Sequence, residues 1–328
     1  MPAPREITYS RNVFIPLTTV CRNRCGYCSF RTPAREGCLL SPEQVTATLM
    51  AGAAVGCTEA LFTFGEMPEI EPDFSFFLQS AGFGSILEYC YEMCRESLRI
   101  GILPHTNAGI LTSEEMERLR KVNASMGLML ETTAELPAHR HSPGKRPEVR
   151  IRMIEEAGEL RIPFTTGILV GIGECREDRE ESLSVIRDLH RRWGHIQEVI
   201  VQNFSPKANT PMEDVKGPSI AEMCDTVRLA REILPSDVSV QIPPNLVEVR
   251  SLIACGANDL GGISPLTVDY INPEHPWPEL EALREALKGY RLAERLCIYP
   301  KYIEKGWYHP NIEGLIRRLA QQIQERSV

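Results

Sequence analysis

Residues 13–28 read Val13-Phe14-Ile15-Pro16-Leu17-Thr18-Thr19-Val20-Cys21-Arg22-Asn23-Arg24-Cys25-Gly26-Tyr27-Cys28. An apolar run typical of a buried strand passes directly into a loop with three cysteines spaced C-x3-C-x2-C. Three thiolates so close in sequence either converge on one centre or repel one another, and soft sulfur ligands select zinc or iron–sulfur clusters. The segment therefore predicts a strand whose following loop, through Cys21, Cys25 and Cys28, binds a metal centre.

Similar apolar, β-branched runs recur along the chain and alternate with stretches of helical period. This is the pattern of repeated β/α units around a parallel sheet. The expected strands are residues 13–17, 60–64, 100–103, 126–130, 168–172, 199–201, 238–242 and, more weakly, the stretch around Leu260. Ser41-Pro42, Thr112-x-x-Glu115 and Ser219-x-x-Glu222 are helix-start signals between them. Eight strands predict an α/β fold, a closed (β/α)8 TIM-type barrel.

The composition excludes several function classes. The chain has 328 residues with 43% hydrophobic and 24% charged content, and its formal charge of -8 argues against a nucleic-acid partner. No run of about 18 apolar residues and no basic-then-apolar amino terminus is present, so we expect a cytoplasmic protein with no membrane segment. Eleven cysteines, an odd number, indicate a reducing compartment rather than a disulfide framework, and we expect Cys90 and Cys94 to be buried packing groups.

The chain contains no Ser/Gly linker or low-complexity run that would mark a domain boundary. The one shift in composition is the Pro-rich stretch Asn272-Pro273-Glu274-His275-Pro276-Trp277-Pro278, which cannot be helix interior. We expect it to be a rigid connection. The prediction is therefore a barrel over residues 1–271 and a C-terminal helical extension, residues 272–328, packed on it.

Polar residues follow the expected strands. In a β/α barrel these positions open onto the carboxyl-terminal face, where active sites of this fold lie. They are Thr18, Gly65-Glu66, His105-Thr106-Asn107, Glu131-Thr132, Gly173-Glu174, Gln202-Asn203, Gln241 and Asn258-Asp259. A polar ring around one end of the barrel is predicted.

Three interpretations of the cysteine loop are open on spacing alone. Structural zinc normally has four protein ligands, and the nearest further cysteine is Cys38, which lies beyond Pro33. Cys25 and Cys28 would also suit a thiol-redox pair, although Cys21 would then have no role. A cubane 4Fe-4S cluster usually takes four cysteines, so three would leave one iron open to an outside ligand.

With Tyr27, the loop fits C-x3-C-x-aromatic-C and resembles the radical S-adenosylmethionine (SAM) enzymes. Phe64-Gly65-Glu66 resembles the Gly-Gly-Glu of that family, with Phe64 in place of the first glycine. Glu131 and Arg150 match an acidic residue and an arginine that contact SAM in related barrels, and residues 167–174 resemble G-x-I-x-G-x-x-E with Leu169 in place of isoleucine. In those barrels the arginine pairs with the carboxylate of SAM, a role that suits arginine because it binds a carboxylate through two parallel hydrogen bonds.

The resemblance implies a radical SAM type of barrel that holds a 4Fe-4S cluster on Cys21, Cys25 and Cys28. It also implies a set of residues that bind SAM. They are Tyr27, Gly65, Glu66, Glu131, Arg150 and Leu169.

Within the family, the chain resembles the CofG type of deazaflavin synthase over nearly its full length. The matching segments include residues 9–18, 25–28, 106–109, 163–167, 202–204, 241–246 and 256–265. The resemblance implies a lyase that converts a tyrosine-diaminouracil adduct, supplied by a sister enzyme, CofH, to 7,8-didemethyl-8-hydroxy-5-deazariboflavin with loss of ammonia. A low-potential ferredoxin- or flavodoxin-type donor would supply the electron. The alternatives are a radical SAM enzyme with another substrate, CofH-like or biotin synthase-like, and a zinc or thiol-redox module.

A polar, uncharged substrate of this kind requires amide and hydroxyl partners more than salt bridges. The expected substrate-binding residues are Thr106, Asn107, Gln202, Asn203, Gln241, Asn245 and Asn258. Asp259 is the expected acid–base group for loss of ammonia, because its carboxyl group lies beside Asn258 in the expected ring.

Overall fold

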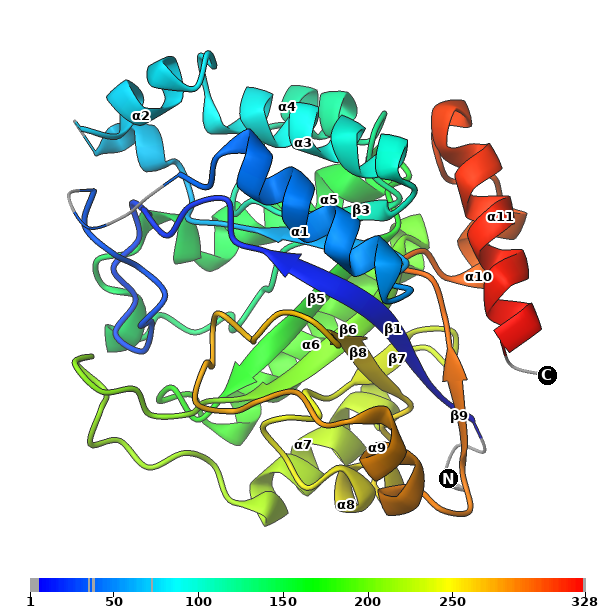
Figure 1. Ribbon diagram of the computed structural model, residues 1–328. Helices are drawn as coiled ribbons and strands as arrows, with labels where there is room; N and C mark the ends of the chain where they lie inside the picture. The colour runs from blue at the N-terminus through cyan, green and yellow to red at the C-terminus, as the bar shows by residue number, and fades with distance from the viewer. Residues whose placement is uncertain (1–5, 35, 37–38, 72, 327–328) are drawn as a thin grey trace.

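The computed structural model describes residues 6–34, 36, 39–71 and 73–326. In this part of the chain, eight parallel strands pair in chain order, and β1 pairs with both β8 and β2, which closes the barrel. The strands are β1 Glu6–Ile15, β2 Glu59–Thr63, β3 Leu103–Asn107, β4 Ser125–Gly127, β5 Phe164–Val170, β6 Ile196–Asn203, β7 Ser239–Gln241 and β8 Asp259–Ile263. The predicted barrel is confirmed, and Figure 1 shows helices lying around its outside.

The covering helices follow the strands in alternation. They are α1 Pro42–Ala54, α3 Ile86–Ile100, α4 Ser113–Leu119, α5 Pro147–Glu159, α6 Arg176–Trp193, α7 Ile220–Ile233 and α8 Val249–Ala254. Capping boxes at Ser41, Thr112 and Ser219 start α1, α4 and α7 as expected. Short elements interrupt the loops after β2 and β4, namely η1 Pro68–Ile70, α2 Phe74–Ser80, η2 Pro137–His139 and η3 Pro143–Lys145.

The third strand begins later than predicted. Residue 100 is the last of α3, and Gly101 ends that helix in the left-handed conformation with φ 104°. The apolar run at 100–103 therefore spans the end of a helix and the start of β3, because both elements bury apolar side chains there. Cys90 and Cys94, on α3, are fully buried as expected.

The carboxyl-terminal part contains a strand as well as helices. It comprises α9 Leu280–Ala286, β9 Arg291–Glu294, α10 Pro300–Glu304 and α11 Pro310–Arg326. β9 pairs with Glu6–Tyr9 of β1, next to the section of β1 that pairs with β2. The buried stripe of α11 packs in one apolar cluster with Leu103 and Ala124, near the amino-terminal ends of β3 and β4. This part of the chain therefore closes the amino-terminal end of the barrel.

Alternate residues of each strand face the interior, as the two-residue period requires. We call the carboxyl-terminal end of the barrel the mouth and the amino-terminal end the floor. Along β2 the residues that line the interior cavity are Glu59, Leu61 and Thr63, and along β6 they are Glu198, Ile200 and Gln202. Along these two strands the interior is therefore polar at both ends and apolar between them. No helix in the described part of the chain is long and apolar enough to span a membrane.

Candidate active site

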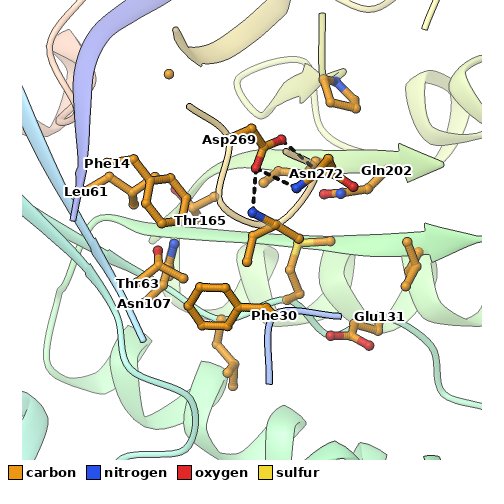
Figure 2. Close-up of a pocket in the computed structure, with 18 of the residues that line it drawn as sticks. Phe14, Phe30, Leu61, Thr63, Asn107, Glu131, Thr165, Gln202, Asp269 and Asn272 are labelled. Atoms are coloured by element: carbon orange, nitrogen blue, oxygen red, sulfur yellow. Dashed lines mark hydrogen bonds between the residues drawn. The ribbon is translucent and has the colours of Figure 1, made fainter. Parts of the chain in front are cut away.

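One cavity of about 420 Å³ extends from the cysteine loop into the barrel. Its walls include the cysteine loop, the ends of several strands and the segment around Asp269 and Asn272. Figure 2 shows Phe14, Phe30, Thr63, Asn107 and Gln202 around this space. The cysteine loop and several of the polar residues expected at the mouth therefore open onto one cavity.

The three cysteines of the motif are free, half-buried thiols that line this cavity. The backbone N–H of Glu66 donates to Cys21 Sγ at 3.2 Å, and the Ser142 hydroxyl donates to Cys25 Sγ at 3.3 Å. Burial raises the pKa of Cys21 to about 11 and raises that of Cys25, so binding of a metal centre would release protons. Among the described residues, no group of three or more His, Cys, Asp or Glu side chains lies close enough to hold a single metal ion, and Cys38 lies outside the described residues.

The loop after β2 lies directly against the cysteine loop. The Gly65 N–H donates to Thr18 O at 2.9 Å, and a Cβ at Gly65 would lie 1.9 Å from Val20 O, so only glycine allows this approach. The Glu66 carboxylate is 3% exposed and accepts from Arg22 Nε at 2.7 Å. Gly65 and Glu66 therefore position the segment that carries the cysteines.

Glu131 follows β4 with a positive φ of 68° and is buried. Its carboxylate accepts hydrogen bonds from the hydroxyl of Tyr27 and the ammonium of Lys145, and it lies 3.1 Å from His139 Nε2 and 3.9 Å from Arg150. Burial raises the pKa of Glu131, but Lys145, His139 and Arg150 outweigh it, so the pKa lies well below its usual range. Glu131 is therefore an ionised carboxylate at the centre of a cationic group.

Lys145 and His139 were not expected in the site. Both belong to short 3-10 helices in the long loop after β4, well beyond the end of that strand. A signal was nevertheless present, because residues 139–146 hold five basic side chains in eight positions.

Arg150, in the first turns of α5, is 3% exposed and lines the cavity. It donates to Gly144 O at 2.9 Å and to Met129 O, which fixes the plane of its guanidinium. Leu169, on β5, lies in a small apolar cluster that includes Tyr27. The structure therefore brings the six predicted SAM-binding residues to one cavity, since Tyr27, Gly65, Glu66, Glu131, Arg150 and Leu169 all line it.

Four of the seven predicted substrate-binding residues line the cavity, namely Asn107, Gln202, Gln241 and Asn245. Thr106 is on the opposite face of β3, where its hydroxyl donates to Asn123 Oδ1 at 2.8 Å. Asn203, the last residue of β6, donates to Leu246 O at 3.3 Å. Neither Thr106 nor Asn203 lines the cavity, because adjacent residues of a strand point to opposite faces.

The prediction that Asn258 and Asp259 lie at the mouth is wrong. Asp259 begins β8 rather than following a strand, and Asn258 precedes it. Asn258 Oδ1 accepts from the Val240 N–H at 2.8 Å. The Asp259 carboxylate is fully buried and accepts from Arg295 Nε at 2.7 Å and from the Tyr299 hydroxyl at 2.9 Å. Both residues therefore belong to the floor.

A further wall of the cavity comes from the segment after β8, which runs into the Pro-rich stretch expected to be a rigid connection. Asp269 Oδ2 accepts from the side-chain amides of Asn245 and Asn272, both at 2.9 Å (Figure 2). Lys207 and Trp277 also line the cavity. The Pro-rich stretch therefore contributes to the site.

Comparisons with known proteins identify the family. Residues 15–186 match the family model described as the radical SAM superfamily. The chain belongs to the radical SAM superfamily. Radical SAM enzymes carry a 4Fe-4S cluster, use SAM and need a reductant.

Several curated relatives of this radical SAM chain are named 7,8-didemethyl-8-hydroxy-5-deazariboflavin synthase. The relative from Methanosphaerula palustris is 64% identical over 322 residues, which cover 98% of both chains. The relative from Methanosarcina barkeri is 57% identical over 96% of this chain and 97% of its own length. The relative from Archaeoglobus fulgidus is 56% identical, also over 96% of this chain and 97% of its own length.

Solved structures share the fold. The FeFe-hydrogenase maturase HydG from Carboxydothermus hydrogenoformans aligns with a TM-score of 0.69 at 20% identity, covering 98% of this chain and 82% of its own. Methylornithine synthase (PylB) aligns with a TM-score of 0.63 at 17% identity, and the alignment covers 97% of this chain and 82% of the other. At these identities the likeness concerns the fold alone.

The residues at the mouth fit the cofactors of the family. Three free thiols are the soft donors that an iron–sulfur cluster requires, and three leave one iron open. The half-buried Lys145 and the buried Arg150 are cations beside the cavity, suited to a carboxylate, and Glu131 is an acceptor suited to an ammonium.

Proposed function

We propose that this chain is a radical SAM ammonia-lyase of the CofG type that forms 7,8-didemethyl-8-hydroxy-5-deazariboflavin. Its substrate would be the adduct 5-amino-5-(4-hydroxybenzyl)-6-(D-ribitylimino)-5,6-dihydrouracil. The observation that carries the proposal is that the cysteine loop, the predicted SAM-binding residues and an amide-rich wall open onto one cavity, in a chain 64% identical to a synthase of that name.

Cys21, Cys25 and Cys28 would hold the cluster, and the Glu131, Lys145 and Arg150 group would bind the methionine end of SAM. When bound, these cofactors would supply a hydrogen-abstracting reagent. The closed barrel and its apolar middle section would exclude water from the reacting atoms. Gly65 and Glu66 would keep the cysteine loop in register with β2, so the reagent is generated at a fixed place.

The atoms of the proposed reaction balance without another oxidant. The adduct loses ammonia and two hydrogen atoms to become the deazaflavin. SAM would accept both hydrogens on its conversion to methionine, 5'-deoxyadenosine and a proton. No external electron would therefore be consumed overall, so a donor would be needed only to reduce the cluster initially, and we propose a low-potential ferredoxin or flavodoxin for this role.

The cavity wall suits a neutral heteroaromatic substrate. Asn107, Gln202, Gln241 and Asn245 present amides that both donate and accept, as uracil edges require. Asn245 is held in place by Asp269, which also binds Asn272. We propose that these residues orient the ring system, which a sister enzyme of the CofH type would supply.

The proposal is tested by incubating the anaerobically reconstituted protein with the purified adduct, SAM and dithionite. We expect deazaflavin fluorescence and 5'-deoxyadenosine in equal amounts, measured by chromatography. If 5'-deoxyadenosine forms without deazaflavin, the chain acts on another substrate. A colourless protein that holds zinc instead of iron, and does not cleave SAM, would contradict the whole assignment.

A further inference from the structure

The floor end of the cavity is polar and lies far from the cysteine loop along the strands. It is lined by Ser10 and Asn12 of β1, Glu59 of β2, His105 of β3, Glu198 of β6 and Arg295, which directly follows β9. Each of these residues is under 8% exposed. We call this set the floor residues. None of them is among the residues predicted to hold the cluster or SAM.

The charges of the floor leave no cation available for a ligand. Of the described residues that line this end, Arg295 is the one that carries a positive charge, and its guanidinium is bound to Glu198 at 2.6 Å and to Asp259 at 2.7 Å. Burial raises the pKa of Glu59 and of Glu198, and burial lowers the pKa of His105 to about 4. The imidazole of His105 is therefore neutral at pH 7.

The floor nevertheless has unused hydrogen-bonding capacity. Asn12 is 1% exposed and lines the cavity, and its Oδ1 has no hydrogen-bond partner. The hydroxyl of Thr63, on the mouth side, is also buried without a partner. A Cβ at Gly262 would lie 2.2 Å from Asn12 Nδ2, so the glycine leaves space for this amide. Buried polar atoms without partners are unfavourable, and a bound hydroxyl group would relieve this.

We propose that the floor residues bind the ribityl chain of the substrate and product as a neutral polyol, and that they reject its phosphate ester. This inference rests on the proposed function, whose product contains such a chain. Each hydroxyl both donates and accepts, so it pairs with the carboxyl groups of Glu59 and Glu198 and with the amide of Asn12. A phosphate ester would place a charge of about -1.5 to -2 beside these carboxyl groups with no free cation to balance it.

The placement also agrees with the proposed chemistry. With the ribityl chain at the floor, the ring system lies in the apolar middle section and toward the cysteine loop. The reacting carbon atoms are then on the cofactor side, where positioning matters most for the rate.

The first test uses the reconstituted wild-type protein and three fluorescent ligands, with binding measured by fluorescence anisotropy. The ligands are the deazaflavin product, its ribityl phosphate ester and an analogue with a methyl group in place of the ribityl chain. We expect both altered ligands to bind roughly tenfold to a hundredfold more weakly than the product, because several hydrogen bonds are lost or a charge is buried. A phosphate ester that binds as tightly as the product would overturn the proposal.

The second test uses Asn12→Ala and Glu59→Gln with the same ligands. We expect each variant to weaken binding of the product about threefold to tenfold and to leave binding of the methyl analogue unchanged. Asn245→Ala, at the side wall, is the matched control and should weaken binding of the product and of the methyl analogue by the same factor. Equal weakening of both ligands by the floor variants would overturn the proposal. If the product does not bind to the wild-type protein at all, the proposed function itself fails, which distinguishes the two outcomes.

Discussion

The mouth and the floor of the barrel are both polar, but they are assembled in different ways. The mouth takes its cysteines from one loop of eight residues and its cationic group from residues 131–150. The floor takes its residues from four strands and from Arg295, so its members are separated by as many as 285 positions, from Ser10 to Arg295. Chemistry that depends on a local motif can be located from sequence, whereas chemistry assembled by barrel closure needs the fold.

The two ends also differ in how their charges are balanced. At the mouth one carboxylate, Glu131, is surrounded by Lys145, Arg150 and His139. At the floor one guanidinium, Arg295, serves Glu198 and Asp259. The mouth can accept a further anionic group, and the floor cannot. The two ends should therefore respond separately to substitution.

The largest expected effect is at the cysteine loop. Cys25→Ala should prevent cluster assembly, so the reconstituted protein loses its brown absorbance and does not cleave SAM. Binding of the deazaflavin product should stay within about twofold of wild type, because hydrogen bonds at the floor remain. Cys175→Ala, at an exposed free cysteine, is the control and should retain both properties. Loss of product binding in Cys25→Ala would show that the two ends are not separable.

The next effect concerns stability at the floor. Arg295→Met should lower the free energy of unfolding by about 3–5 kcal/mol, because it leaves buried carboxylates unpaired. Its side chain is 6% exposed, while that of Arg317, paired with Glu313 on α11, is 74% exposed. Arg317→Met should therefore cost at most about 1 kcal/mol. Urea unfolding of both variants measures the difference, and equal midpoints would refute the role assigned to the floor pair.

Arg150→Lys tests the cationic group of the mouth. A lysine cannot form two parallel hydrogen bonds, so SAM should bind roughly tenfold to a hundredfold more weakly, as expected for lost hydrogen bonds to a charged group. Equilibrium dialysis with the reconstituted protein measures this affinity. Arg146→Lys, four residues earlier with a side chain 68% exposed, is the control and should bind SAM normally. Unchanged SAM affinity in Arg150→Lys would remove Arg150 from the cofactor site.

The smallest effect is a pH dependence at the floor. The pKa of His105 is lowered to about 4 by burial, while an unfolded histidine has a pKa of about 6.5, so the unfolded chain binds this proton first. The contribution of His105 to stability is therefore complete above pH 6.5 and is lost as the pH falls toward 4. Lowering the pH from 7.5 to 5.5 should therefore reduce the free energy of unfolding by roughly 1 kcal/mol through His105.

Urea unfolding at several pH values measures this contribution. The slope of stability against pH should be smaller in His105→Asn than in wild type, and it should be unchanged in His141→Asn, where the side chain is exposed. An unchanged slope in His105→Asn would indicate that the floor is hydrated and open at neutral pH.

The sequence predicted the mouth better than the floor for a physical reason. Tyr27, Glu131 and Arg150 follow strands or motifs with fixed spacing, so their place could be expected without coordinates. Glu59 begins β2 and Glu198 lies inside β6, where a lone charged residue gives no sign of whether it faces the barrel interior or a helix. The side of Thr106 depends on strand register, which loop patterns do not reveal.

The start of β8 shows a second limit. Its apolar run is short and contains two glycines, so Asn258 and Asp259 could be assigned to either end of the strand. Their true position depends on Arg295 and Tyr299, which meet Asp259 only after the chain has passed through α9 and β9. No local pattern could have linked these residues.

The pairing of β9 with β1 has a consequence for biosynthesis. Glu6–Tyr9 can acquire this neighbour only when residues 291–294 have left the ribosome, so this edge of β1 stays open until then. Contacts of such long range form slowly, and an open edge can pair with other chains in the meantime. Nascent copies should therefore depend on chaperone protection until β9 has been synthesised.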